Sequence, residues 1–200
     1  MKTIERMHEK LIVGRRAKVL SRHLAELLWP NVSVLDVGCG DGQIASLVQS
    51  PRHDVTISGV DVLVRKHTFV PVKPFDGVTL PFEDYAFDVV TFVDVLHHTM
   101  DPLALLREAG RVCRRGVIIK DHTLSGVLAG PTLKFMDLIG NGRHGVALPF
   151  NYWSPQQWNS AFTQLNWTID ERRTSLGLYP FPVSLLFGRS LHFVARLLPR

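Results

Sequence analysis

Three glycines at alternate positions, Gly38, Gly40 and Gly42, carry the strongest chemical signal in this sequence of 200 residues. They follow an apolar run that predicts a strand over 32–37, and a helix is predicted next, over 43–49. Glycine lets the backbone approach a bound molecule where any side chain would fill the space. The free N–H groups at the start of the helix add hydrogen-bond donors. The segment therefore predicts a ligand-binding loop between a strand and a helix.

The spacing of these glycines distinguishes between classes of ligand. A dinucleotide loop has the pattern Gly-x-Gly-x-x-Gly, whereas here Gln43 occupies the position of the third glycine. A phosphate-binding P-loop is excluded because no Gly-Lys-Ser/Thr follows. A glycine loop alone is a weak signal, and a structural turn in another α/β protein is the alternative interpretation.

Two acidic positions follow in an order that suits a nucleoside ligand. The run Val55–Asp61 predicts a second strand, and its final carboxylate comes 25 residues after Asp36, where a ribose-binding acid is expected after roughly 20. Asp61 could accept hydrogen bonds from ribose hydroxyls or cap a following helix, and both interpretations stay open. Asp76 and Gly77 then begin a short turn ahead of another predicted strand.

These motifs together resemble the class I S-adenosylmethionine-dependent methyltransferases, most closely the small-molecule group that includes the ubiquinone and menaquinone C-methyltransferases. The resemblance covers roughly 32–122 and includes the later motifs Leu80-Pro81-Phe82 and Phe87-Asp88-Val89-Val90. It implies a Rossmann-like α/β fold: a seven-stranded, mostly parallel sheet with helices on both faces and the last strand antiparallel. It also implies S-adenosylmethionine as the cofactor.

The resemblance further implies which residues bind S-adenosylmethionine. The acid that matches Asp76 accepts a hydrogen bond from the adenine amino group, and the backbone of the residue that matches Gly77 faces the ring. Ligands of open α/β sheets bind beyond the carboxyl ends of the strands, so we expect the whole set along one edge. That set is Asp36, Gly38, Gly40, Gly42, Asp61, Val62, Asp76, Gly77 and Val93.

Histidines near the ends of two later strands offer proton-transfer chemistry. His98 is our candidate general base because imidazole titrates near neutrality, and a packing or capping role is the alternative. His97 is interpreted as structural, and Asp121 and His122 are weaker candidates for substrate contact. A His/Asp metal site stays open as an alternative, but no close ligand spacing supports one, and no metal ligands are assigned.

The methyl acceptor is predicted to be small and largely apolar. The segments 123–153 and 174–189, together with the N-terminal helices, are expected to form a mobile cover. Their aromatic residues suit an apolar acceptor or ordinary core packing. The sequence after the strand, Asp94-Val95-Leu96-His97, lacks the Asn/Asp-Pro-Pro-aromatic run of enzymes that methylate exocyclic or amide nitrogens. An RNA methyltransferase and a non-catalytic cofactor-binding partner subunit are the alternatives.

Composition indicates a globular domain with a modest positive charge. The net charge is +5, but the basic residues are scattered, so nucleic acid is compatible as a partner without being favoured. Cys39 and Cys113 form no disulfide framework, which favours a cytoplasmic protein. No apolar run approaches the length of a membrane span. The oligomeric state is not predicted.

The periodicity predicts one domain over 1–200, with a helical cover over 1–30 and an inserted helix and loop over 123–153. Gly14 is expected to break the N-terminal helix, and Gly130-Pro131 to bend the inserted one. The remaining predicted elements are a helix begun by Asp101-Pro102, a strand over 116–120, an inserted helix over Ser125–Asn141, a loop over Asn141–Gly145, a helix begun by Ser154-Pro155, and strands over Trp167–Arg173 and Leu191–Leu198.

Overall fold

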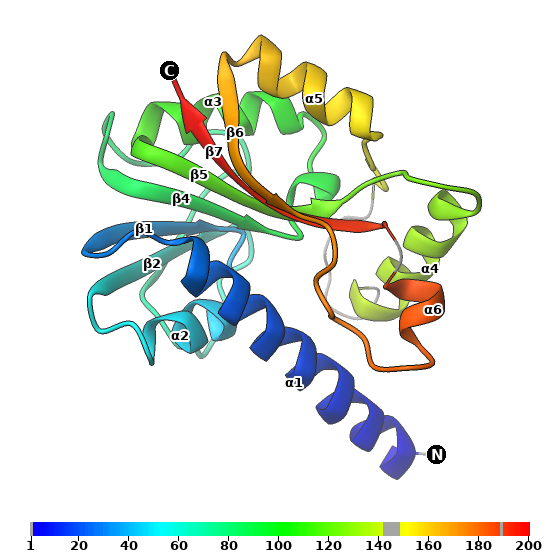
Figure 1. Ribbon diagram of the computed structural model, residues 1–200. Coiled ribbons are helices and arrows are strands. Elements are labelled where there is room, and N and C mark those ends of the chain that lie inside the picture. The colour runs from blue at the N-terminus through cyan, green and yellow to red at the C-terminus, as the bar shows by residue number, and fades with distance from the viewer. Residues whose placement is uncertain (1, 142–148, 189) are drawn as a thin grey trace.

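The computed structural model describes residues 2–141, 149–188 and 190–200, with side chains in the first helix from residue 14 onward. These residues form one seven-stranded sheet flanked by helices (Figure 1). Its strands are β1 (Val32–Val37), β2 (Val55–Asp61), β3 (Val72–Pro74), β4 (Phe87–Val93), β5 (Cys113–His122), β6 (Trp167–Arg173) and β7 (His192–Pro199).

The sheet has the strand order β3-β2-β1-β4-β5-β7-β6. Strands β1 to β5 pair in parallel, whereas β7 lies antiparallel between β5 and β6. The predicted Rossmann-like sheet with its last strand antiparallel is confirmed. Strand β3 is a short edge strand that the sequence pattern did not predict.

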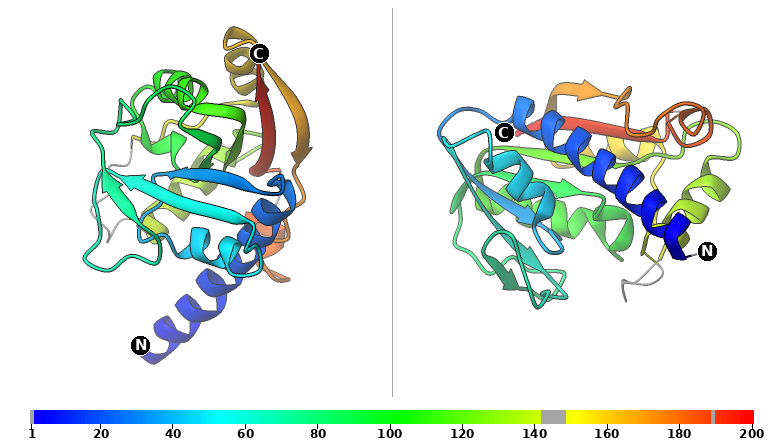
Figure 2. Two further views of the ribbon diagram at one scale, coloured as in Figure 1. Left: turned by 90° about the vertical axis from the view of Figure 1, so that its left-hand side faces the viewer. Right: turned by 90° about the horizontal axis from the view of Figure 1, so that it is seen from below.

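Helices cover both faces of this sheet. On one face lie α1 (Lys2–Leu27) and α2 (Gln43–Gln49), and on the other α3 (Pro102–Val112) and α5 (Pro155–Gln164) (Figures 1 and 2). Each face has its own buried cluster, represented by Leu20 and Val48 on the first and by Leu106 and Trp158 on the second. Burial of these side chains, at roughly 25 cal/mol per Å² of apolar area, holds the layers together.

A smaller group of helices lies beyond the carboxyl ends of β4 and β5. The 3-10 helix η1 (Leu96–His98) follows β4, and α4 (Ala129–Asn141) and α6 (Ser184–Phe187) lie side by side (Figure 1). The rings of Phe135 and Phe187 stack between them with centroids 6.3 Å apart. This group therefore borders the same edge of the sheet as the glycine loop.

Two of the predicted helix starts are confirmed in detail. Asp101 accepts a hydrogen bond from the backbone N–H of Ala104 at 3.0 Å, with Pro102 in the first turn. Ser154 and Gln157 form a reciprocal capping box at the start of α5.

Two expectations about helix interruption are wrong. Helix α1 runs through Gly14 without a break, because a glycine costs a helix about 1 kcal/mol but removes no hydrogen bond. Helix α4 begins at Ala129 instead of bending at Pro131, which falls in the first turn, where its missing N–H needs no partner. The loop expected over Asn141–Gly145 lies, from residue 142 on, outside the described residues.

Among the described helices, none is long and apolar enough to cross a membrane. Cys39 and Cys113 are both free thiols.

Candidate functional site

The glycine loop, residues 38–42, joins β1 to α2 with all three glycines in the left-handed region, at φ of +70°, +61° and +79°. A Cβ on Gly38 would lie 2.6 Å from Val95, and one on Gly42 would lie 2.5 Å from Val70. A Cβ on Gly40 would meet no atom within 4 Å. Gly38 and Gly42 are thus required by packing within the protein, whereas Gly40 borders open space that a ligand could fill.

Asp61 fixes the shape of this loop. Its carboxylate accepts a hydrogen bond from the backbone N–H of Gly40 at 2.7 Å through one oxygen and from Leu63 at 2.8 Å through the other. No helix follows β2 directly among the described residues, so the expected helix cap is instead an Asx-type turn. The acid predicted to bind ribose lies beside the loop, and its contact with ribose stays a prediction.

Asp36 lies almost fully buried in β1. The Thr91 hydroxyl of β4 donates a hydrogen bond to its carboxylate at 2.8 Å. Burial raises the pKa of Asp36 to about 7, which the Thr91 bond opposes and the nearby Asp61 charge reinforces. The structure thus places Asp36 as a buried support for the strand that leads into the loop.

The second predicted turn lies next to β2 on the same edge. Oδ1 of Asp76 accepts hydrogen bonds from the backbone of Val78 at 2.8 Å and Thr79 at 2.7 Å, and these bonds lower the pKa of Asp76. A Cβ on Gly77 would lie 3.2 Å from Val62, whose side chain is 64% exposed. Val62 and Val78, both exposed, are apolar side chains at this turn that suit a flat aromatic ring. Leu63, Val64 and Phe69, in the segment after β2, are further exposed apolar side chains.

Val93, the last predicted cofactor residue, ends β4 and is partly buried. The structure therefore brings the whole predicted set to the carboxyl edge of β1, β2 and β4, as the topology requires.

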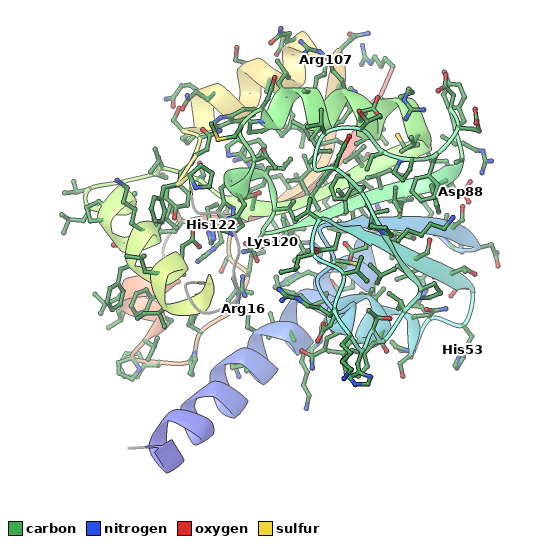
Figure 3. The ribbon with its side chains drawn as sticks, turned by 180° about the vertical axis from the view of Figure 1, so that it is seen from behind. Arg16, His53, Asp88, Arg107, Lys120 and His122 are labelled. Carbon is green, nitrogen blue, oxygen red and sulfur yellow. The ribbon has the colours of Figure 1, made fainter. Side chains whose placement is uncertain are left out.

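Charged and polar side chains gather in a second place, beyond the carboxyl ends of β4 and β5. In Figure 3 Lys120 and His122 lie close together, with Arg16 nearby on α1, and His53 and Asp88 lie at the opposite edge. We call this group the buried polar cluster. Its members are Arg16, Asp94, His97, Lys120, Asp121, His122, Asp137, Tyr152 and His192.

Asp94 is the centre of charge in this cluster. Lys120, which is fully buried, and Arg16 of α1 each donate to a different oxygen of its carboxylate. Burial alone would raise the pKa of Asp94, but the two cations outweigh it and hold that pKa well below its usual range. The ion pair links α1 to the sheet at the edge where the ligand is expected.

The histidines of β5 and β7 are neutral neighbours of this ion pair. Nδ1 of His122 lies 3.0 Å from Nδ1 of His192, and Nε2 of His192 lies 2.9 Å from the Phe187 carbonyl. Since a carbonyl only accepts, Nε2 of His192 donates, and Nδ1 of neutral His192 must accept. Burial and the charge of Lys120 lower the pKa of His192 to about 3 and that of His122 well below its usual range.

His97 and Asp137 connect the cluster to α4. Nδ1 of His97 lies 2.6 Å from a carboxylate oxygen of buried Asp121, and Nε2 lies 3.5 Å from Asp137. Burial disfavours the imidazolium, but the charges of Asp121 and Asp137 prevail and raise the pKa of His97 to about 10. Asp137 also accepts a hydrogen bond from the Tyr152 hydroxyl. The interpretation of His97 as structural is consistent with this burial.

The candidate base His98 borders this cluster. It is half-buried, with its ring centroid 4.0 Å from that of His97. Burial and the charge of His97 lower the pKa of His98, which keeps its imidazole neutral near pH 7. Asp121 and His122, the weaker candidates for substrate contact, are buried, at 0% and 3% exposure. Their side chains contact His97 and His192 within the cluster.

Sequence reasoning missed several members of the cluster: Arg16, Asp137, Tyr152 and His192. Arg16, Asp137 and His192 lie in α1, α4 and β7, and Tyr152 lies in the segment before α5, so no local spacing connects them. The only signal available was their residue type in segments expected to be apolar, such as Asp137 within the inserted helix.

Comparisons with known proteins agree with this geometry. Residues 35–119 match a family described as a methyltransferase domain. The chain is 34% identical over 104 residues to a ubiquinone biosynthesis O-methyltransferase of Thiobacillus denitrificans, covering 46% of this chain and 44% of that protein. It is 29% identical over 96 residues to 27-O-demethylrifamycin SV methyltransferase of Amycolatopsis mediterranei, covering 42% and 35%. The chain thus aligns with less than half the length of these curated relatives.

A solved structure extends the likeness over nearly the whole fold. The complex of the Haloferax volcanii Trm112 methyltransferase activator with the putative methyltransferase matches with a TM-score of 0.71 and 15% identity, covering 96% of this chain and 94% of that one. At this identity the likeness shows the fold alone.

The sheet order and the open glycine loop define an α/β domain of the Rossmann-like methyltransferase class. Over the matched segment 35–119, the chain is similar to the class I S-adenosylmethionine-dependent methyltransferases. The methyl donor of this class is S-adenosylmethionine, and the open space at Gly40 beside Asp61 fits its nucleoside.

Proposed function

We propose that this chain binds S-adenosylmethionine along the edge formed by the glycine loop, Asp61 and the turn at Asp76-Gly77, and transfers its methyl group to a small, largely apolar acceptor. The observation that carries the proposal is the open space at Gly40 inside a loop whose other two glycines are fully packed. The exposed valines beside Gly77 supply apolar contacts for an adenine ring. When bound, the cofactor supplies a methyl group on a positively charged sulfur.

In this proposal, residues of the chain position the acceptor and accept the proton that it loses. We propose a hydroxyl acceptor because the two relatives described above are named for O-methylation or an O-demethylated substrate. The neutral imidazole of His98 takes the hydroxyl proton. The charge of Asp94, Arg16 and Lys120 is paired within the cluster, so these residues stabilise the edge without binding a charged acceptor.

We also propose that α1, together with the described parts of the 123–153 insertion (123–141 and 149–153) and of the 174–189 segment (174–188), covers the acceptor side and excludes water. The apolar nature of the acceptor is supported by exposed side chains in the described part of this cover, such as Phe135 and Phe181. A cytoplasmic location and action without a nucleic-acid partner are parts of the same proposal.

Two measurements test the proposed function. Calorimetry should show binding of S-adenosylmethionine and S-adenosylhomocysteine, and none of NAD. Incubation of cell extract with the protein and methyl-labelled cofactor, followed by untargeted mass spectrometry, should yield one labelled small molecule. NAD binding without a response to either sulfur nucleoside would overturn the proposal. If the methyl label appears only in RNA, the protein is an RNA methyltransferase. If the cofactor binds but no labelled product forms, a non-catalytic cofactor-binding partner subunit is favoured.

Hydrogen exchange tests the cover. Exchange over 125–140 and 174–188 should be faster than over β1 and β4 and should slow when cofactor is added. Equally slow exchange in all of these segments, with and without cofactor, would show that the cover is ordinary core.

A further inference from the structure

Three side chains with metal-binding atoms converge where η1 meets α4. His97, His98 and Asp137 each offer one nitrogen or oxygen atom, and these atoms lie within 4.8 Å of one another. Nε2 of His97 and Oδ2 of Asp137 are 3.5 Å apart. Two ligands bound to one tetrahedral Zn²⁺ at about 2.1 Å each would be about 3.4 Å apart, so this pair already has the separation that an ion requires.

His97 is oriented as metal-binding histidines commonly are. Its Nδ1 lies 2.6 Å from the carboxylate of Asp121, so that nitrogen donates and Nε2 is directed toward Asp137. Among the described residues, this Nε2 atom has no hydrogen-bond partner, although His97 is only 2% exposed. A carboxylate behind a ligating histidine fixes the ring and increases its basicity toward an ion.

The charge of the surroundings also favours a cation. The described cluster contains three carboxylates, Asp94, Asp121 and Asp137, and two basic side chains outside its histidines, the cations Arg16 and Lys120. Both cations are directed at Asp94, which leaves Asp121 and Asp137 without one. Buried carboxylates need a compensating positive charge, and a bound cation between His97 and Asp137 would supply one.

We propose that His97 Nε2, His98 and Asp137 bind one divalent transition-metal ion of the Zn²⁺ type. Two imidazoles and a carboxylate are the ligand set of catalytic zinc sites, which keep a further position open for water or a substrate oxygen. Nε2 of His122 lies 3.9 Å from the other oxygen of Asp137.

The ion would tie the inserted helix α4 to the end of β4. Asp137 belongs to α4 and the two histidines to η1, so one ion bridges the proposed cover and the sheet. With the ion bound, His98 would be a ligand and not the base; the ion would lower the pKa of an acceptor hydroxyl, whose proton would pass to water. This catalytic part rests on the proposed function, whereas metal binding itself does not.

The test measures metal binding without cofactor or acceptor. Chelator-treated protein is incubated with Zn²⁺ alone, bound zinc is counted by mass spectrometry, and Co²⁺ absorption reports on coordination. The variants are Asp137→Asn and His98→Gln, and the matched control is His53→Gln, an exposed histidine at the opposite edge of the molecule (Figure 3). We expect one Zn²⁺ per chain in the wild type and control, and at least tenfold weaker binding in both site variants.

The outcomes separate the two proposals. No bound Zn²⁺, or equal binding in all four proteins, would overturn the metal site and leave the methyltransferase proposal intact. One bound ion in a protein that fails to bind S-adenosylmethionine would overturn the proposed function and leave the site. Circular dichroism checks that each variant folds. If Asp137→Asn does not fold, the half-buried His98→Gln decides the question.

Discussion

The glycine loop and the buried polar cluster lie on the same edge of the sheet but are built in opposite ways. The loop is formed by residues 38–42, and its main support, Asp61, comes from the neighbouring strand. The cluster draws on residues from Arg16 to His192, carried by helices and strands that meet only in the folded chain. The first site is encoded by local backbone shape and the second by topology. Substitutions in the loop should therefore affect ligand binding, and those in the cluster should affect stability.

The largest expected effect is the loss of cofactor binding in Gly40→Val. The branched side chain would fill the open space at Gly40 while the fold, which has no atom within 4 Å of that Cβ, is retained. Calorimetry with S-adenosylmethionine measures the effect. Gly126→Val is the matched control, because Gly126 also has positive φ and open surroundings but lies outside the loop. Normal binding by Gly40→Val would show that the loop does not hold the cofactor.

On the cluster side, Asp94→Ala should destabilise the protein by about 3 kcal/mol, because it leaves Lys120 buried without its counter-charge. Chemical denaturation measures this free energy of unfolding. Asp84→Ala breaks an exposed pair with Arg111 and should cost under about 1 kcal/mol. If the two variants lose the same free energy of unfolding, the buried ion pair contributes no more to stability than an exposed one.

Asp61→Ala sharpens the comparison because Asp61 supports the loop from the end of β2 and is also largely buried. We expect binding of S-adenosylmethionine to weaken by roughly 1.5–3 kcal/mol, the range for hydrogen bonds to a charged group. The loss combines the ribose contact that we propose with the tie to the Gly40 N–H. An unchanged dissociation constant in a folded variant would restrict Asp61 to the turn at Leu63.

The smallest effect concerns pH and Asp36. Because its folded pKa is raised to about 7, the folded state favours the protonated form, so its stabilising effect is present at low pH and is lost as pH rises toward 7. Wild-type stability should fall by about 1 kcal/mol per pH unit between pH 5 and 6.5, relative to Asp36→Asn. Denaturation curves at several pH values measure the difference. Parallel pH profiles for the two proteins would contradict the shift.

Sequence patterns predicted the features that depend on residues close together in the sequence. The bounds of α2 and β2 were predicted residue for residue, and so were the caps at Asp101 and Ser154, because each depends on side chains a few positions apart. Strand β3 was missed because three residues ending in Pro74 have too few alternating positions to show a pattern. Its proline is tolerated at the sheet edge.

The candidate site divides in the same way. The edge that carries Gly40, Asp61 and Asp76 could be predicted from order and spacing, whereas its contacts with ligand remain predictions. The shared contact of Lys120 and Arg16 with Asp94 could not be predicted, because the two residues are 104 positions apart and only the packing of α1 on the sheet brings both to Asp94. A lysine within an apolar strand indicates that it is buried but does not indicate which residue it contacts.

The strand order has a consequence for how the chain assembles during synthesis. Strand β6 is made before β7, yet β7 separates it from β5, so β6 has no place in the sheet until β7 has left the ribosome. His192, at the start of β7, is also among the last groups to reach the polar cluster. A nascent chain can therefore close its glycine loop early, but the buried polar cluster on the same edge becomes complete only when β7, His192–Pro199, is available.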